Sequence, residues 1–338
     1  MPPSQVPISI LLPVYNDGHY LVRAVRSLQR QTLACWELLL LDDGSRDGTG
    51  ELAESLQQGD GRIRVFHFPH RGIAGTLNEG LSRARGRYVA RMDADDISHV
   101  RRLALQKDFL DRRADLCAVG SLVRVFPRAG MTAGMLAYEG WVNSLVRPDE
   151  IAREIFVDAP LVHPSVMIRR RDLEAVGGYG LEGPEDFDLW LRLHLKGMRF
   201  AKVPSILLFW MDRQERATRC SPAYRKQAFR KCRAVHLARW IGGGREVLLA
   251  GKKEAKRLGS LLEEQGLRVA AYVDLDPKTI GARRRGMPII SYESLAGGKL
   301  GAARLILAAV GTRGAREEIR GRLRGLGYRE IEDFLCVA

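Results

Sequence analysis

The first part of the chain alternates short apolar runs with segments of helical periodicity, and this alternation limits the fold more than any other feature. Ile8–Val14 and Trp36–Leu41 are continuous apolar runs, typical of strands that are covered on both faces. The other expected elements are strands at Ile63–Phe68 and Arg87–Met92 and helices at Tyr20–Gln31, Glu51–Gln57 and Ala74–Arg85. Such alternation predicts an α/β fold, a mostly parallel sheet with helices on both faces.

Polar residues follow these strands, at the edge where an open α/β sheet binds its ligands. The fourth strand ends in Asp93, Asp95 and Asp96. Side chains at i and i+2 of an extended segment point to the same side, so Asp93 and Asp95 can converge on one target. Carboxylates this close repel each other unless a cation lies between them, and Mg²⁺ or Mn²⁺ is the usual ion. The alternative is an acidic turn in which Asp96 starts the next helix.

Composition limits the partners. The chain has 338 residues, enough for two domains, and 46% are hydrophobic and 28% charged, as in an ordinary globular protein. With 54 basic and 40 acidic residues, its formal net charge is +14. This balance suits phosphorylated molecules or an anionic membrane, or reflects an arginine-rich composition. We expect no nucleic-acid partner, because no zinc-finger spacing or aromatic RNA-binding signature is present.

Cysteine usage and hydropathy predict a cytoplasmic protein. The five cysteines are scattered and form no Cys-x-x-Cys pair, which argues against a disulfide framework or a zinc site. No apolar stretch approaches the roughly 20 residues that span a bilayer, and the N-terminus lacks a secretory pattern. The basic amphipathic helix expected at Tyr224–Trp240 either lies on the anionic inner face of the membrane or packs its apolar stripe on its own domain.

A second α/β series follows Gly242-Gly243-Gly244, the clearest linker. We therefore divide the chain into a first domain (1–222), the basic helix and glycine-rich linker (223–244) and a smaller Rossmann-like domain (245–338). In the last domain, Ala250–Ala255 stands where a dinucleotide-binding domain has Gly-x-Gly-x-x-Gly, and the replaced glycines obstruct the approach of a pyrophosphate. Asp274 is placed to hold a ribose. We expect a regulatory domain or an assembly surface.

Several motifs of the first domain occur in a characteristic order. They are Pro13-x-Tyr15-Asn16, Asp42-Asp43-Gly44-Ser45-x-Asp47-Gly48-Thr49, Asn78-x-Gly80, Gly86-x-Tyr88 and Asp93-x-Asp95-Asp96. Over roughly residues 6–220, the chain resembles the family 2 glycosyltransferases of the GT-A fold. The resemblance implies inverting, metal-dependent transfer of a sugar from a nucleotide sugar, on this pattern a UDP-sugar, with Mn²⁺ or Mg²⁺ as cofactor. The implied acceptor is a glycan, lipid-linked or other hydroxyl in cell-surface polysaccharide or glycan assembly.

The resemblance also assigns roles to the strand-end residues. Asp43 is expected to accept the N3–H of uracil, with Tyr15 beside the base and Pro13 offering backbone contacts. Asp93 is expected at the ribose and the metal, and Asp95 as the direct metal ligand. For the acids that follow strand 2, turn and helix-cap chemistry is the competing interpretation.

Transfer requires a carboxylate base on the face opposite the leaving group. The resemblance selects Asp186, with Glu185 in reserve; the alternative is that these acids stabilise the first turn of a helix. The residues expected around the sugar pocket, some with a purely structural alternative, are His163, Gly178, Tyr179, Trp190, Arg216 and Arg219.

Other functions remain open at this point. The chain lacks the Gln-x-x-Arg-Trp motif of processive synthases, which favours transfer of single sugars. A non-catalytic nucleotide-sugar binding or scaffold protein is one alternative. An NAD-dependent sugar-modifying enzyme that works through the C-terminal domain is another.

Overall fold

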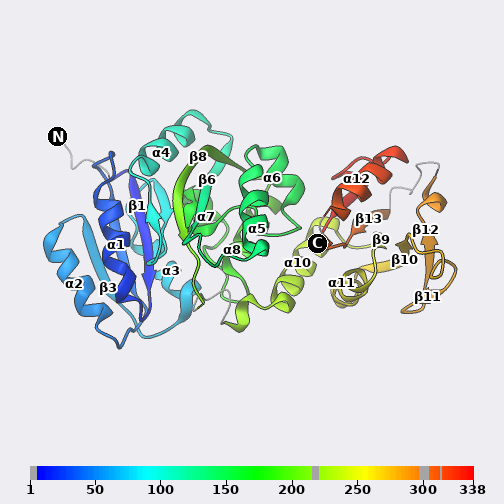
Figure 1. Ribbon diagram of the computed structural model, residues 1–338, viewed down its shortest axis with the longest axis horizontal. Helices are drawn as coiled ribbons and strands as arrows, with labels where there is room; N and C mark the ends of the chain where they lie inside the picture. The colour runs from blue at the N-terminus through cyan, green and yellow to red at the C-terminus, as the bar shows by residue number, and fades with distance from the viewer. Residues whose placement is uncertain (1–5, 215–220, 297–303, 313) are drawn as a thin grey trace. The chain divides into compact units, whose positions relative to one another are not determined.

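The protein divides into two compact units in a computed structural model that describes residues 6–214, 221–296, 304–312 and 314–338. The first unit comprises Met1–Ile151 and Pro160–Ser221, and the second comprises Ala152–Ala159 and Pro222–Ala338. Figure 1 follows the chain from the N-terminal to the C-terminal unit by colour. Each unit is built on its own sheet.

The first unit is built on an eight-stranded mixed sheet. Its strands are β1 (Ile8–Val14), β2 (Glu37–Asp42), β3 (Ile63–His67), β4 (Tyr88–Arg91), β5 (Ile97–Ser98), β6 (Leu116–Phe126), β7 (Met167–Arg169) and β8 (Arg199–Met211). Its helices are α1 (Gly18–Gln29), α2 (Thr49–Gly59), α3 (Gly72–Arg83), α4 (Arg102–Arg112), α5 (Ala133–Ser144), α6 (Pro148–Glu154, of which Ile151 is the last residue in this unit), η1 (His163–Ser165), α7 (Arg170–Ala175) and α8 (Glu185–Leu195).

The strand order is β3-β2-β1-β4-β7-β6-β8-β5. Strands β1 to β4 run parallel, as the sequence predicts, whereas β7 is antiparallel to both β4 and β6. Because parallel strands end at one edge, the polar residues after β1, β2 and β4 meet there. The antiparallel β7 enters the sheet from that same edge, so η1 also lies there.

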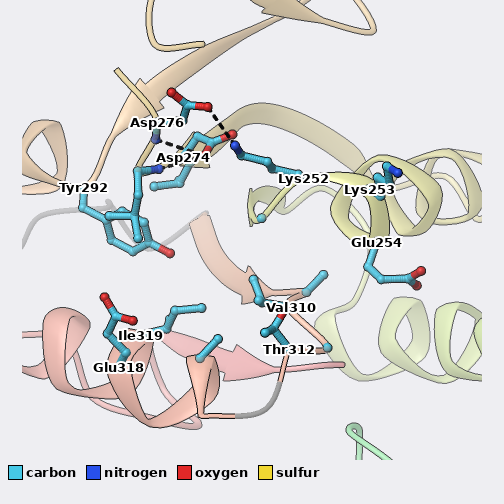
Figure 2. Close-up of a pocket in the computed structure, with 16 residues that line it drawn as sticks. Lys252, Lys253, Glu254, Asp274, Asp276, Tyr292, Val310, Thr312, Glu318 and Ile319 are labelled. Carbon is cyan, nitrogen blue, oxygen red and sulfur yellow. Dashed lines mark hydrogen bonds and ion pairs between the residues drawn. The ribbon is translucent and has the colours of Figure 1, made fainter. Parts of the chain in front are cut away.

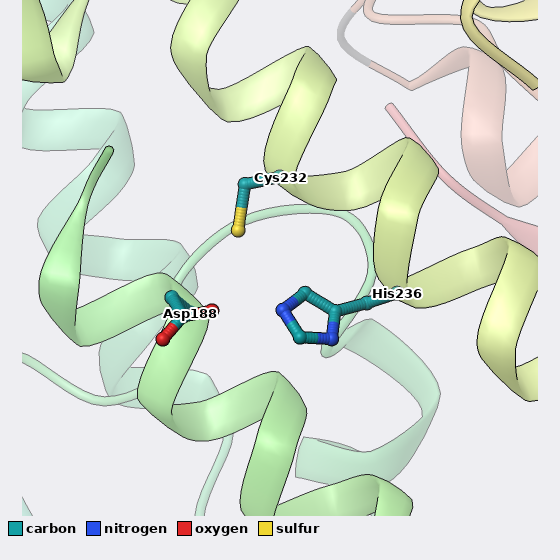
Figure 3. A group of neighbouring side chains, drawn as sticks. All are labelled: Asp188, Cys232 and His236. Carbon is teal, nitrogen blue, oxygen red and sulfur yellow. The ribbon is translucent and has the colours of Figure 1, made fainter. Parts of the chain in front are cut away.

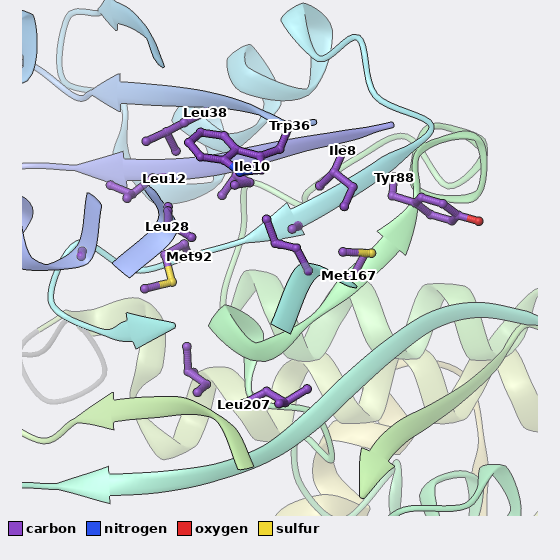
Figure 4. Packing of buried hydrophobic residues seen from close by; sticks show 14 of the residues in the cluster. Ile8, Ile10, Leu12, Leu28, Trp36, Leu38, Tyr88, Met92, Met167 and Leu207 are labelled. Carbon is purple, nitrogen blue, oxygen red and sulfur yellow. The ribbon is translucent and has the colours of Figure 1, made fainter. Parts of the chain in front are cut away.

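Side chains of the central strands point alternately to two helical layers. Ile10 and Leu12 of β1 pack in the main core with Leu28 of α1 (Figure 4). Leu11 and Leu41 face the other way, toward α3, where a Cβ on Gly80 would lie 2.5 Å from Leu41 Cδ1. The glycine of the Asn78-x-Gly80 motif therefore lets α3 lie close against the sheet.

The second unit contains a six-stranded sheet of order β11-β12-β10-β9-β13-β14. All neighbouring strands are parallel except the pair β11–β12. The elements are η2 (Pro222–Tyr224), α10 (Lys226–Ile241), β9 (Glu246–Ala250), α11 (Lys253–Glu264), β10 (Arg268–Asp274), β11 (Arg283–Arg284), β12 (Met287–Ser291), η3 (Glu293–Leu295), β13 (Arg304–Ala308), α12 (Ala315–Gly325) and β14 (Phe334–Cys336). Figure 1 shows α11 and α12 on opposite sides of this sheet.

The basic helix α10 packs within the second unit, as in the packing alternative of the sequence analysis. Arg233 is buried and donates from Nε to the carbonyl of Phe156 (2.6 Å) and from a terminal nitrogen to that of Val157 (2.7 Å). Cys232 and His236 project from one face of the helix, one turn apart (Figure 3). Part of the basic character of α10 thus serves internal hydrogen bonding.

Segment 152–159 is also tied into the second unit by a buried arginine. Arg320 of α12 is 2% exposed and pairs with Glu154 (2.5 Å), Glu330 (2.7 Å) and Glu317 (2.6 Å). Glu154 and Glu330 are nearly as buried as the arginine. Removing one partner of such a cluster leaves an uncompensated charge in the interior.

No helix within the described ranges is long and apolar enough to cross a membrane.

Candidate active site

The acids that follow β1 and β4 form the centre of the site, and two arginines balance them. Oxygen atoms of Asp93, Asp95 and Asp96 lie within 4.8 Å of one another. Arg213, just past the end of β8, donates from Nε to Asp95 Oδ2 (2.7 Å) and from a terminal nitrogen to Asp17 Oδ2 (2.5 Å).

Asp17 belongs to this acidic group although the sequence analysis did not single it out. The pKa of its carboxyl is raised to about 6, chiefly by burial; Arg213 opposes the rise, and the charges of Asp95 and Asp93 add to it. Its position directly after Asn16, at the end of the first strand, was the sequence feature that could have indicated this role. Burial is thus the main reason that this carboxylate resists ionisation, and the neighbouring acids strengthen the effect.

This donor set fits a divalent cation. Mg²⁺ and Mn²⁺ prefer carboxylate oxygens, and Asp93 and Asp95 supply them from one strand end. Arg213 holds Asp95 Oδ2, so that oxygen becomes a ligand only when the guanidinium moves away.

Asp96 does not start a helix, so that expectation is wrong. The short strand β5 follows it, and α4 begins only at Arg102. The Asp96 side chain is fully buried, and its Oδ1 accepts a hydrogen bond from the backbone N–H of Met211 (2.8 Å). It thereby fixes the end of β8 and so the starting point of Arg213.

Arg91, the last residue of β4, is a buried cation in an otherwise apolar strand. It pairs with Asp93 (2.6 Å), and the charge of Glu185 also acts on it. Burial lowers the pKa of Arg91, but these two carboxylates more than offset that effect, so the net pKa is raised and Arg91 stays charged. Arg91 therefore interacts both with an acid that follows β4 and with an acid that opens α8. The sequence analysis did not predict this role.

Asp43 is held by four donors in the absence of ligand. Its Oδ1 accepts from Thr76 Oγ1 (2.7 Å) and the backbone N–H of Arg71 (2.9 Å). Its Oδ2 accepts from the backbone N–H of Gly72 (3.0 Å) and lies 2.9 Å from His70 Nδ1. A carboxylate offers about four such positions, so Asp43 orders the turn before α3 and meets a further donor only if one partner leaves.

The nucleoside side of the site contains an aromatic pair. Tyr15 is half-exposed, and its ring stacks on that of His70 with centroids 4.3 Å apart. Pro13 lies in β1 and is half-buried. His70 has the most exposed side chain of the four Asp43 partners. It covers Asp43 and is also the surface against which Tyr15 packs.

Asn78 clamps the turn that carries Gly178 and Tyr179. Its Nδ2 donates to the carbonyl of Tyr179 and its Oδ1 accepts from the N–H of Tyr179, both at 2.8 Å. Gly178 has φ +72°, and a Cβ there would lie 2.4 Å from Asn78 Oδ1. The Asn78 and Gly178 motifs thus form one positioning device, which joins segments about 100 residues apart.

The first turn of α8 separates the two candidate bases. Glu185 is buried, and its Oε1 lies 3.3 Å from His163 Nδ1. Burial lowers the pKa of His163, so neutral imidazole is favoured. Asp186 is half-buried and accepts from the N–H of Phe187 (2.7 Å), while Asp188 pairs with Arg192 within the helix. Asp186 is thus the more accessible of the two candidates.

Aromatic residues pack around His163, the partner of Glu185. Trp190 is 1% exposed and packs edge-on against His163 and Phe200, with centroids 5.9 and 6.0 Å apart. It thus occupies the core, the packing alternative for this residue. Tyr179 is also buried, and its ring is tilted against that of His163 at 5.5 Å. Arg216 and Arg219 lie outside the described residues.

The mixed sheet of the first unit is similar to the GT-A fold of solved transferases. S. aureus TarS 1–349, in complex with UDP-GlcNAc, matches with a TM-score of 0.57 at 16% identity, over 77% of this chain and 71% of the TarS 1–349 chain. The mannosyltransferase PcManGT from Pyrobaculum calidifontis, in complex with GDP-Man and Mn²⁺, matches with a TM-score of 0.50 at 20% identity, over 69% and 62%. At these identities the likeness concerns the fold.

The chain belongs to glycosyl transferase family 2, which matches residues 9–177. EpsE of Bacillus subtilis, named as a glycosyltransferase, is 31% identical over 198 residues, which are 57% of this chain and 68% of EpsE. Other curated relatives are matched over as little as 18% of their own length.

Proposed function

We propose that the protein transfers a sugar, with inversion, from a UDP-sugar to an acceptor hydroxyl in polysaccharide or glycan assembly, with the help of Mn²⁺ or Mg²⁺. One observation carries the proposal. The acids Asp17, Asp93 and Asp95 meet at the carboxyl edge of the sheet, where Arg213 spans Asp17 and Asp95 as a removable counter-charge. Names of family relatives and the sugar nucleotides bound by TarS and PcManGT support this function class.

In this proposal Asp95 binds the cation directly and Asp93 joins it at the ribose. When bound, the cation acts as a Lewis acid toward the departing nucleoside diphosphate. Arg213 would have to move away from Asp95 Oδ2 for that oxygen to hold the cation. Because its guanidinium stays charged, it remains available to a phosphate oxygen at the same edge.

The uracil binds between Tyr15 and Asp43. For its N3–H to reach Asp43, His70 has to leave, since the other three donors belong to the backbone and to buried Thr76. His70 binds Asp43 through an exposed side chain, so its displacement disrupts the fold least.

Asp186 is the base that removes the proton from the acceptor hydroxyl. Attack on the anomeric carbon from the face opposite the nucleotide needs a carboxylate that the acceptor can reach. Glu185 is buried against His163 and serves to hold the start of α8, while Asp186 is more accessible in the same turn. The Asn78 clamp on Tyr179 shapes the sugar pocket beside it.

The test combines binding with turnover. We expect thermal stabilisation by one UDP-sugar that requires Mn²⁺, since a ligand that binds only the folded state raises the melting temperature. Asp95→Ala should abolish the metal-dependent part of this shift. Asp186→Asn should retain it but reduce transfer at least 100-fold, within the usual contribution of a general base.

Three outcomes would each contradict one part of the proposal. Full transfer by Asp95→Ala would remove the metal from the mechanism, and unchanged turnover in Asp186→Asn would remove that base. Stabilisation by GDP-sugars in place of UDP-sugars would overturn the assignment of the nucleotide while leaving the metal site intact.

A further inference from the structure

A cavity of about 580 Å³ lies in the second unit, beyond the carboxyl ends of β9, β10 and β13 (Figure 2). The strand order reverses at β9, because β10 and β12 follow on one side and β13 and β14 on the other. Open α/β sheets bind ligands at such a reversal. The volume is in the range of small-molecule sites.

Gly251 makes this cavity possible at the turn between β9 and α11. Its φ is +122°, and a Cβ there would lie 2.7 Å from the carbonyl oxygen of Ala309. Only glycine therefore allows the turn to lie against the end of β13. The next residues, Lys252 and Lys253, bring the N-terminus of the 12-residue helix α11 to the cavity wall.

The charged residues around the cavity can accommodate one additional anion. Each acid that lines it already has a basic partner: Asp274 with Arg284, Asp276 with Lys252, Glu318 with Arg322 and Glu254 with Arg230. Lys253 has no ion-pair partner among the residues that the structure describes. Its charge adds to the positive end of α11, a combination that suits a single phosphate group.

The largely buried side chain of Tyr292 directs its hydroxyl into the cavity from the opposite wall. Tyr292 is 4% exposed, and Figure 2 shows its hydroxyl directed into the open space. Within the described ranges, its oxygen takes part in no hydrogen bond. The charged groups that face it are Asp274, Glu318 and Arg322. A hydroxyl that faces open space and has no partner in the described protein is free to bond a ligand atom.

The remaining walls fit a nucleoside. Asp274 ends β10, the position from which an acid can accept from ribose hydroxyls. Leu275, Val310 and Ile319 give an apolar surface next to Tyr292, as a base requires. Lys252 and Lys253 stand where glycines would let a pyrophosphate approach the backbone, so a longer phosphate chain fits poorly.

We propose that this cavity binds a ribonucleotide with a single phosphate, independently of the donor site of the first unit. The phosphate lies at Lys253 and the N-terminus of α11, the ribose at Asp274, and the base against the apolar wall, within reach of the Tyr292 hydroxyl. The site would report nucleotide levels to the enzyme or anchor a nucleotide-bearing partner.

Hydrogen exchange on the full chain tests the site, because it locates binding by segment. UMP, AMP, GMP and CMP and their nucleosides are added in EDTA, which keeps the donor site free of metal. We expect at least one monophosphate to protect residues 250–256 and 305–312 and to bind about tenfold more tightly than its nucleoside, the value of a charge-assisted hydrogen bond.

Two variants with matched controls identify the contacts. Lys253→Ala should abolish the advantage of the monophosphate and leave nucleoside binding unchanged, whereas Lys256→Ala, an exposed lysine one turn further on, should have no effect. Tyr292→Phe should weaken nucleotide and nucleoside alike by about fivefold, the worth of one hydrogen bond. Tyr272→Phe removes a buried hydroxyl that does not line the cavity and should change neither.

Three results would overturn the inference. One is an absence of protection at 250–256 with all eight compounds. Another is tighter binding of NAD or UDP than of any monophosphate at that loop. The third is protection confined to residues 91–97, which would place the nucleotide at the donor site and leave the proposed transfer activity untouched.

Discussion

Arg213→Met should destabilise the metal-free protein and tighten its binding of Mn²⁺. Arg213 pairs with Asp95 at 2.7 Å and with Asp17 at 2.5 Å, and its side chain is 21% exposed. Breaking a fully buried pair costs about 3–5 kcal/mol, so we expect about 2–3 kcal/mol for this partly exposed one. For a unit of this size, that loss lowers the melting temperature in EDTA by roughly 5–10 °C.

The free energy of the Arg213 ion pairs also affects metal binding. In the wild-type protein the cation has to displace the guanidinium from Asp95, and the cost of breaking the pair weakens the apparent affinity. Without Arg213 that cost is gone, so the Kd for Mn²⁺ should fall by about 10–100-fold, at about 1.4 kcal/mol for each factor of ten. Titration calorimetry with Mn²⁺ alone, at pH 7.5 and low salt, measures it directly.

Arg23→Met is the matched control. The Arg23 guanidinium donates to the backbone carbonyl of Asp95 at 3.0 Å and leaves the carboxylate alone, so Mn²⁺ affinity should not change. If Arg213→Met lowered the melting temperature but left Mn²⁺ binding unchanged or weaker, Arg213 would not compete with the cation, and the counter-charge argument would fail.

Other predictions concern pH, the sugar pocket and the second unit. Burial and neighbouring carboxylates raise the pKa of Asp17 to about 6, so the folded state binds the Asp17 proton more tightly than the unfolded state does. As the pH rises from about 4 to 6, the stability of the metal-free protein should therefore fall, while its affinity for Mn²⁺ should rise. Asp17→Asn should flatten both pH dependences. Asn78→Ala removes both hydrogen bonds to Tyr179 and should lower turnover about tenfold at unchanged UDP affinity; weaker UDP binding would argue against a role confined to the sugar pocket. Arg320→Met should cost about 3–5 kcal/mol in denaturant unfolding, against less than about 0.5 kcal/mol for the exposed Arg322→Ala, and equal effects would refute the buried cluster.

Local pattern was enough to predict most of the regular structure. The strand at Ile8–Val14 has the bounds that its apolar run indicates, and the helix expected at Ala74–Arg85 is found at Gly72–Arg83. These predictions succeed because the burial of a continuous apolar run, or of one face of a helix, can be inferred from residues that are close together in the sequence. The interpretation of Asp96 as a helix start fails for the opposite reason. Its hydrogen-bond partner, the Met211 N–H, is 115 positions away, and no residue near Asp96 in the sequence indicates this contact.

The sequence by itself determined that strands alternate with helices, that their carboxyl ends share an edge, and that carboxylates gather there. Only the tertiary structure decided how the charges are balanced. Arg213 lies 196 positions from Asp17, and Glu185 differs from Asp186 in its burial against His163. The energy of a charge depends on the burial and distance of its partners, which are set by the packing of segments far apart in the chain.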